Sequence, residues 1–424
     1  MANKNPLNFA RREITVMKTL VRFVAITLTL GFLAASASAD DAKFDLIQTV
    51  HDHGAQVSKV VIDGNTKING ESLALDSFRV VTDNSLEDMY VLNGEIPVVE
   101  AYVSDSAEGS KTDAGSYVVL YLKNGLDSGA ANVLQWDNGL FMNRVLDLNY
   151  IVTQEKELLT SDDAPFKYAS LTQGGIINRE VEAFGAGGSN GLNYRYYRPN
   201  EPGGAGRHPL IVYFHGGGEG GDSNVSHLLS ERTALSFATE ENQEKFDYPY
   251  VLAPQCPTFW VQEFRLGFIT LKGQDYTKDV AALIREFIAA RDDIDTSRVY
   301  VGGHSMGGWQ TWAVAAESPS LFAAMFPLST ARDIPDNILR EVKDIPNWIS
   351  HVESDILTSV EFSRSAYSRL RDMGGAPVYV ELDMVEVNDI RYNPHAIWVA
   401  ASNNAIVNDR GIRILDWLAK QVKR

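Results

Sequence analysis

Short stretches of alternating apolar and polar residues dominate the chain between about residues 43 and 160. Residues 77–82 and 116–122 show the period of two that is typical of strands burying one face. Turn-forming dipeptides separate the stretches, namely Asp63-Gly64, Asn69-Gly70, Asn93-Gly94 and Asn124-Gly125. Such dipeptides supply the positive φ angles of tight hairpins. The pattern predicts an all-β sandwich over residues 40–160, immunoglobulin-like in architecture.

The pattern changes after about residue 180, where whole strands become apolar. Residues 210–214 and 299–301 are nearly continuous apolar runs, as expected for strands that are buried on both faces. Helical stretches such as residues 279–291 alternate with these runs. We therefore expect an α/β domain over residues 181–424, with a mostly parallel sheet covered by helices on both faces, and a linker over residues 161–180.

The first 39 residues have the three parts of a secretory signal peptide. Basic residues at Lys18 and Arg22 precede an uncharged, mostly apolar run over residues 23–35, and small residues follow at 37–39. The apolar run is too short to span a bilayer comfortably, although an uncleaved membrane anchor is the alternative. The sequence predicts export to the periplasm or the medium, with no stable membrane insertion after cleavage.

Length, charge and cysteine content narrow the possible functions. A chain of 424 residues favours two domains of unequal size. Its net charge of −17 repels phosphate backbones, so nucleic-acid binding is disfavoured. Cys256 is the only cysteine, which excludes an intrachain disulfide and cysteine-based zinc or iron–sulfur sites.

The strongest chemical motif is Gly303-His304-Ser305-Met306-Gly307-Gly308. It follows an apolar strand and precedes a helical stretch, which is the context of a nucleophile elbow. Glycines are needed there because the turn is strained and the helix packs closely against the strand. The motif predicts that Ser305 is a nucleophile at a helix N-terminus, where backbone N–H groups face a developing oxyanion.

A glycine-rich loop, residues 215–221, follows the strand at residues 210–214. Such a loop lets backbone amides approach a substrate oxygen closely. One oxyanion donor is expected from this loop and the other from the residue after the serine. Gly217 and Met306 are the predicted donors, with Gly216 as the neighbouring alternative and as a candidate residue of the substrate pocket. A phosphate-cradling loop is disfavoured because the Gly-Lys-Ser/Thr ending is absent.

A nucleophilic serine needs a base and an acid that orients the base, expected in the order Ser, acid, His. His395 lies in a loop after the last strong strand, so we predict that it is the base. His351 is the other histidine after Ser305, and we expect a structural role for it. Asp355 is the predicted acid, because it ends a strand–loop unit well before His395. Asp383 and Asp389 remain rivals.

The remaining candidates carry weaker signals. Phe259 and Trp260 follow the turn at Cys256 and can wall an acyl or aryl pocket or simply pack in the core, whereas Cys256 itself is expected to be a small buried filler. Glu219 and Asp222 form a weak case for a cation site, and we predict no metal and no cofactor.

Residues 180–424 resemble secreted α/β-hydrolase esterases of the polyhydroxybutyrate-depolymerase and feruloyl-esterase group, and they are similar to the catalytic domain of prolyl oligopeptidases. The resemblance implies an α/β-hydrolase fold and agrees with Asp355 as the acid. An immunoglobulin-like domain ahead of such a hydrolase is similar to some bacterial esterases. Val352 and the Ala396-Ile397 pair depart from the usual pattern, which affects the expected pocket shape. The segments that carry the resemblance are residues 213–222, 251–257, 294–308, 321–324, 346–355 and 395–398.

The prediction is therefore a secreted serine carboxylesterase that works through an acyl-enzyme, without a cofactor, on a small-molecule or polymeric ester. Three alternatives stay open: a serine peptidase of the prolyl-oligopeptidase type, a polyester or feruloyl ester hydrolase, and a non-catalytic polymer-binding protein. An intact Ser–Asp–His order disfavours the last, because a decayed enzyme usually loses one of the three residues first.

Overall fold

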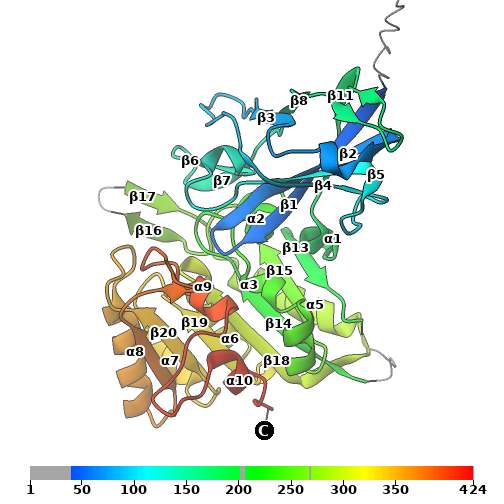
Figure 1. Ribbon diagram of the computed structural model, residues 1–424. Coiled ribbons are helices and arrows are strands. Elements are labelled where there is room, and N and C mark those ends of the chain that lie inside the picture. Colours follow the sequence, from blue (N-terminus) through cyan, green and yellow to red (C-terminus); the bar gives the residue numbers. More distant parts are fainter. Residues whose placement is uncertain (1–39, 201–205, 267–268, 424) are drawn as a thin grey trace, which may run out of the picture. The chain divides into compact units, whose positions relative to one another are not determined.

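The computed structural model describes residues 40–200, 206–266 and 269–423. Its C-terminal part is built around an eight-stranded sheet in the order β12-β13-β15-β14-β18-β19-β20-β21 (Figure 1). The sheet is parallel from β15 to β21, and β12 and β13 pair antiparallel at one edge. The strands are β12 (Gly185–Ser189), β13 (Leu192–Tyr197), β14 (His208–Phe214), β15 (Tyr250–Gln255), β18 (Ile294–His304), β19 (Ala324–Leu328), β20 (Trp348–Val352) and β21 (Val378–Leu382).

Helices cover both faces of this sheet because successive strand residues are buried on opposite sides. In β14, Val212 packs into a core with α5 and α6, whereas Ile211 belongs to the core on the other face with α3 and α9. The predicted parallel sheet with helices on both faces is thereby confirmed. The helices of the first face are α5 (Thr277–Ala289), α6 (Met306–Glu317), α7 (Asp336–Val342) and α8 (Val360–Asp372); those of the second include α2 (Ser226–Leu229), α3 (Thr233–Ser236), α9 (Ile397–Ser402) and α10 (Ile414–Leu418).

The N-terminal part is all β, as predicted. A five-stranded sheet has the order β11-β1-β2-β5-β4, and β3 and β8 form a separate pair whose apolar side chains join the same core. A hairpin of β6 and β7 extends from this part. The strands are β1 (Asp41–His51), β2 (Gly54–Asn69), β3 (Phe78–Thr82), β4 (Val98–Ser104), β5 (Ala114–Leu122), β6 (Leu134–Asp137), β7 (Met142–Val145), β8 (Tyr150–Gln154) and β11 (Ser170–Ile177).

The segment expected to be a linker, residues 161–180, holds strand structure instead. β10 (Pro165–Phe166) pairs with β9 (Leu158–Leu159), and β11 forms the sheet edge, parallel to β1. β11 was not predicted from the sequence, because Gly174 and Gly175 interrupt its apolar pattern and an edge strand is only partly buried. The sandwich sheet therefore extends to residue 177, beyond the expected boundary at 160.

The two parts share one hydrogen-bonded framework, since Ala37–Arg424 form a single compact unit. The backbone N–H of Val50 donates to Glu180 Oε2 at 3.0 Å, and the same carboxylate pairs with Arg232 at 3.1 Å. Asn403 near the C-terminus donates to Asp52 in the sandwich at 3.0 Å. These bonds tie the first hairpin of the sandwich to the helical layer of the C-terminal part.

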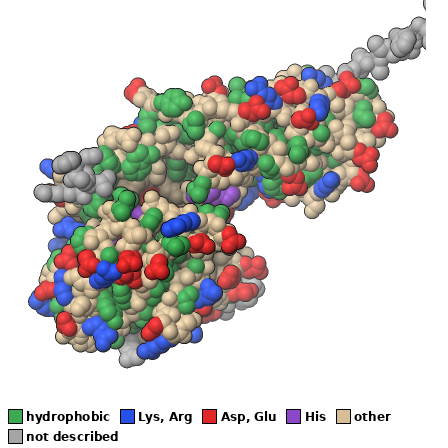
Figure 2. All heavy atoms as spheres, turned by 60° about the vertical axis from the view of Figure 1, so that its left-hand side comes forward, with side chains coloured by type: hydrophobic (Ala, Val, Ile, Leu, Met, Phe, Trp, Pro, Cys, Tyr) green, Lys and Arg blue, Asp and Glu red, His purple; other side chains and the backbone are tan. Residues whose placement is uncertain are grey.

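Acidic and basic side chains are interspersed over the face in Figure 2, rather than gathered in one basic patch. Within the described residues, no helix is long and apolar enough to cross a membrane. The predicted signal peptide falls on residues 1–39, outside the described residues, so it stays a prediction.

Candidate active site

Ser305 occupies a sharp turn between β18 and α6. Its φ of 55° and ψ of −118° lie in a region that non-glycine residues rarely adopt. The N–H of Ser305 donates to the carbonyl of Leu328 at 2.9 Å, which ties the turn to β19. A Cβ on Gly307 would lie 2.2 Å from the carbonyl oxygen of Phe214, so only glycine permits this close approach. The geometry is that of a nucleophile elbow.

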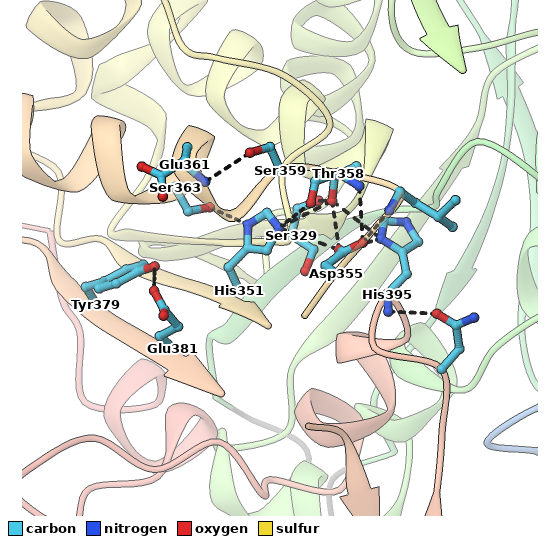
Figure 3. Close-up of polar contacts among 12 residues, drawn as sticks. Ser329, His351, Asp355, Thr358, Ser359, Glu361, Ser363, Tyr379, Glu381 and His395 are labelled. Atoms are coloured by element: carbon cyan, nitrogen blue, oxygen red, sulfur yellow. Dashed lines mark hydrogen bonds and ion pairs between the residues drawn. The ribbon is translucent and has the colours of Figure 1, made fainter. Parts of the chain in front are cut away.

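Asp355 and His395 meet although 40 residues separate them. His395 Nδ1 lies 2.7 Å from Asp355 Oδ2 (Figure 3). Because the carboxylate accepts, Nδ1 carries the proton, which leaves Nε2 as the nitrogen able to take a proton. Asp355 follows β20, and the loop that carries His395 precedes α9.

Several donors hold the Asp355 carboxylate in place. Its Oδ1 accepts from the backbone N–H groups of Leu357 at 2.9 Å and Thr358 at 3.1 Å, and Thr358 Oγ1 donates to Oδ2 at 2.8 Å. Burial alone would raise the pKa of Asp355, but hydrogen bonds from His351 and His395 hold that pKa well below its usual range. The carboxylate is therefore ionised at neutral pH and suited to stabilise an imidazolium.

His351 lies on the far side of Asp355 from His395 (Figure 3). It is buried, and its Nε2 donates to the carbonyl of Thr358 at 3.1 Å and lies 3.5 Å from Asp355 Oδ2. Its Nδ1 accepts from Ser363 at 2.8 Å. These contacts fit the structural role expected for His351, that of a neighbour that fixes the acid loop.

The two rival carboxylates lie elsewhere. Asp383 is exposed and its carbonyl accepts from Ser354 at 3.1 Å. Asp389 is exposed in the turn between β22 (Glu386–Val387) and β23 (Ile390–Arg391), with a φ of 63°. The structure thus brings Asp355, rather than either rival, to the imidazole of His395.

The glycine-rich loop lies beside the elbow, as the sequence predicts for an oxyanion site. Gly216, Gly217 and Met306 all line the same pocket as Ser305 and His395. A Cβ on Gly217 would lie 3.0 Å from the side chain of Met306, so the two predicted donors are close neighbours. Met306 is the first residue of α6, where N–H groups have no partner within the helix.

His215 at the start of this loop holds the loop in shape. Its Nδ1 donates to the carbonyl of Gly216 at 2.7 Å, and its Nε2 accepts from the N–H of Cys256 at 3.2 Å. Burial lowers the pKa of His215 to about 4, so the ring is neutral. Cys256 is fully buried, in agreement with its expected packing role.

The pocket has a volume of about 350 Å³ and is mainly apolar. Of the three predicted pocket residues, Gly216 and Phe259 line it. Trp260 is turned away: it packs against Phe214 and His215, with ring centroids 5.4 and 5.0 Å apart, and borders a separate hollow beside Trp309. Adjacent loop residues project in different directions, so the sequence alone could not separate Phe259 from Trp260.

Several residues that line the pocket were not predicted from the sequence. They come from four segments far apart in the chain: Trp136 and Phe141 of the sandwich, Phe264 and Leu271 of the β16–β17 hairpin (Glu263–Leu266 and Ile269–Lys272), Leu357, and Trp398. The Asn138-Gly139 dipeptide between two aromatic residues was the available signal for the first pair.

Glu219 lies in the pocket wall with its side chain 12% exposed, rather than in an open cation site with Asp222. Its Oε2 lies 3.8 Å from His304 Nε2 and 3.9 Å from His215 Nδ1. Burial, reinforced by the nearby charge of Glu231, raises the pKa of Glu219 to about 8. Asp222 is exposed, and in the described ranges no group of three or more His, Cys, Asp or Glu side chains could hold a metal ion.

Comparisons with known proteins fit this geometry. A family model described as the esterase Ig-like N-terminal domain matches residues 43–167, and the prolyl oligopeptidase family model matches residues 259–364. The crystal structure of a thermostable esterase is 27% identical with a TM-score of 0.74, over 90% of this chain and 99% of that chain. The chain is a serine hydrolase of the esterase type. Its predicted α/β-hydrolase fold, preceded by an immunoglobulin-like domain, is confirmed.

More distant structures also match this hydrolase. A ferulic acid esterase is 12% identical with a TM-score of 0.39, over 54% of this chain and 92% of that chain. An acylaminoacyl peptidase from Pyrococcus horikoshii is 16% identical with a TM-score of 0.35, over 51% of this chain and 39% of that chain. No curated protein matches the hydrolase.

Proposed function

We propose that this hydrolase is a secreted carboxylesterase in which Ser305 is the nucleophile, His395 the base and Asp355 the orienting acid. Ser305 Oγ attacks the ester carbonyl carbon while its proton passes to His395 Nε2. The carbonyl oxygen becomes an oxyanion that accepts from the N–H groups of Gly217 and Met306. The tetrahedral intermediate collapses, the bond to the alcohol oxygen breaks, and His395 returns the proton to that oxygen.

Water completes the cycle. It attacks the acyl-enzyme carbonyl and gives a proton to His395, and the second intermediate releases the carboxylic acid as the proton returns to Ser305 Oγ. No redox or group-transfer cofactor enters this sequence of steps, because the attacking and leaving atoms are all supplied by the serine, the ester and water.

The observation that carries the proposal is the 2.7 Å contact between His395 Nδ1 and Asp355 Oδ2, beside a pocket that His395 shares with Ser305. A carboxylate on Nδ1 fixes the tautomer in which Nε2 is basic, which is the arrangement a serine nucleophile needs. The mainly apolar pocket lining favours an ester whose bound group is uncharged.

Replacement of the nucleophile tests the proposal. Ser305→Ala is expected to lower kcat on p-nitrophenyl esters by about 10³- to 10⁶-fold, because the acyl-enzyme cannot form. A folded Ser305→Ala protein that keeps more than about a tenth of the wild-type turnover would contradict the assignment. The control is Ser170→Ala, since Ser170 is exposed on β11 of the sandwich and lies outside the pocket lining.

A serine peptidase is the second candidate, favoured by the prolyl oligopeptidase match over residues 259–364. A peptide anilide and feruloyl methyl ester, run beside the p-nitrophenyl esters, separate the possibilities. We expect kcat/KM on the best ester to exceed that on the anilide; the reverse order would favour the peptidase.

Export is proposed from the sequence of residues 1–39. Secreted protein is expected to begin at Asp40, which mass spectrometry of its N-terminal peptide measures. Recovery of the activity only in the cytoplasm, with the N-terminal residues retained, would contradict export.

A further inference from the structure

One wall of the active-site pocket comes from the N-terminal sandwich. The β6–β7 hairpin places Trp136 and Phe141 in the lining that includes Ser305 and His395. Trp136 is 41% exposed, so a substantial part of its residue surface remains accessible in the part of the chain that the structure describes. An exposed aromatic ring beside a nucleophile points to contact with substrate rather than to core packing.

Internal bonds hold the tip of this hairpin in one shape. Asp137 Oδ1 accepts from the N–H of Leu140 at 3.0 Å, and the carbonyl of Asp137 accepts from the N–H of Phe141 at 2.8 Å. The indole N–H of Trp136 donates to Asn138 Oδ1 at 3.1 Å. The rings of Trp136 and Phe141 meet edge to face with centroids 6.2 Å apart, so both rings present a fixed surface.

The hairpin is also fixed to the glycine-rich loop of the hydrolase. The N–H of Asn143 donates to the carbonyl of Gly218 at 2.7 Å, and Asn143 Nδ2 donates to Ser230 Oγ at 3.3 Å. A Cβ on Gly218 would lie only 2.8 Å from the Trp136 ring. Gly218 directly follows Gly217, so the hairpin packs beside the proposed oxyanion donor.

We propose that this hairpin sets the size of the apolar ester group that the enzyme accepts, with Trp136 and Phe141 as specificity-determining residues. The inference rests on the proposed esterase function and assigns its substrates as esters of medium-length alkyl or aryl acids. A space of about 350 Å³ suits one such group, with the carbonyl at Ser305 and the apolar part against the two rings. A longer chain must extend past the hairpin into solvent.

Chain-length profiles test the proposal. The kcat/KM values for p-nitrophenyl acetate, octanoate and palmitate are measured for the wild type and Trp136→Ala. Loss of the ring is expected to lower kcat/KM for octanoate by about tenfold and for acetate by less than about threefold, because only the longer acyl group reaches the wall. Trp136→Phe is expected to restore most of the octanoate activity.

A matched control lies in the same turn. Leu140 is 55% exposed and is not among the pocket-lining residues, so Leu140→Ala is expected to leave the acetate-to-octanoate ratio unchanged.

Gly218→Ala tests the same pocket wall from the hydrolase side. Its new methyl group would displace the Trp136 ring, so its effect on octanoate is expected to be smaller in the Trp136→Ala background than in the wild type.

An unchanged acetate-to-octanoate ratio in folded Trp136→Ala would overturn the proposal. A second experiment separates the role of the hairpin from the esterase assignment. It measures the rates at which a methyl phosphonate and an octyl phosphonate label Ser305. If the wild type is labelled but turns over no ester, the esterase proposal fails, and the octyl-to-methyl ratio in Trp136→Ala still decides the role of the hairpin. If the wild type is not labelled by either probe, both proposals fail.

Discussion

In the hydrolase sheet, every residue of β14 and β20 is buried, whereas β8 of the sandwich exposes alternate residues. The difference follows from what covers each sheet: two helical layers in one, a single apolar core in the other. In the hydrolase part, the strand ends carry the proposed catalytic residues, since Ser305 follows β18 and Asp355 follows β20. The sandwich instead contributes through a hairpin that leaves its main sheet.

This comparison assigns turnover to the hydrolase part and the recognition of apolar substrate groups partly to the sandwich. Changes at the strand ends should therefore alter kcat, and changes in the hairpin should alter selectivity. A strand-end substitution that alters only selectivity, or a hairpin substitution that alters only kcat, would contradict this division.

The acid is expected to have the largest effect after the nucleophile itself. Asp355→Asn should reduce kcat by at least about 10²-fold, because the amide neither fixes the His395 tautomer nor stabilises the imidazolium. Asp383→Asn and Asp389→Asn should each change kcat by less than about tenfold. Single-turnover kinetics on folded variants measures this, and the acid is misassigned if Asp383→Asn or Asp389→Asn is crippled while Asp355→Asn turns over normally.

Glu219 gives a smaller, pH-dependent effect. With a pKa raised to about 8, its carboxyl is neutral at pH 7 and ionises as the pH rises above 8. The new negative charge would arise in the pocket that must also hold the proposed oxyanion, and the neighbouring His215 and His304 would not offset it, because burial keeps both rings neutral. We expect wild-type kcat to fall severalfold between pH 7 and 9.5, and Glu219→Gln to remove this fall. An alkaline fall that persists in Glu219→Gln would contradict the role of Glu219.

Stability provides a second readout for the same group. Between about pH 4.5 and 8 the folded state holds a proton on Glu219 that the unfolded state has lost, so the free energy of unfolding decreases as the pH rises. Glu219→Gln should flatten that dependence. Glu231→Gln is the comparison variant. Glu231 is buried, with a pKa raised to about 7, and lies outside the pocket lining, so this variant should keep the alkaline fall in kcat. The fall should begin at a lower pH, because the charge of Glu231 helps to raise the pKa of Glu219.

The sequence predicted those parts of the fold and site that local patterns encode. Apolar runs predicted the hydrolase strands, and the strand–glycine–helix context of Ser305 predicted the elbow geometry that the structure has. The contact of Trp136 with the glycine loop was not predictable, because it joins residues 82 positions apart through tertiary packing alone. β11 was missed because two glycines replace the side chains whose alternation would have revealed it.

The most direct test of the central claim is to identify the residue that carries the covalent adduct after the wild-type enzyme reacts with a fluorophosphonate. Peptide mapping by mass spectrometry is expected to find one adduct, on Ser305, because its hydroxyl alone combines the elbow with a base and an oxyanion site. Labelling should slow markedly in Asp355→Asn, which retains Ser305. An unmodified Ser305 in fully inhibited enzyme, with the adduct on another residue, would contradict the account.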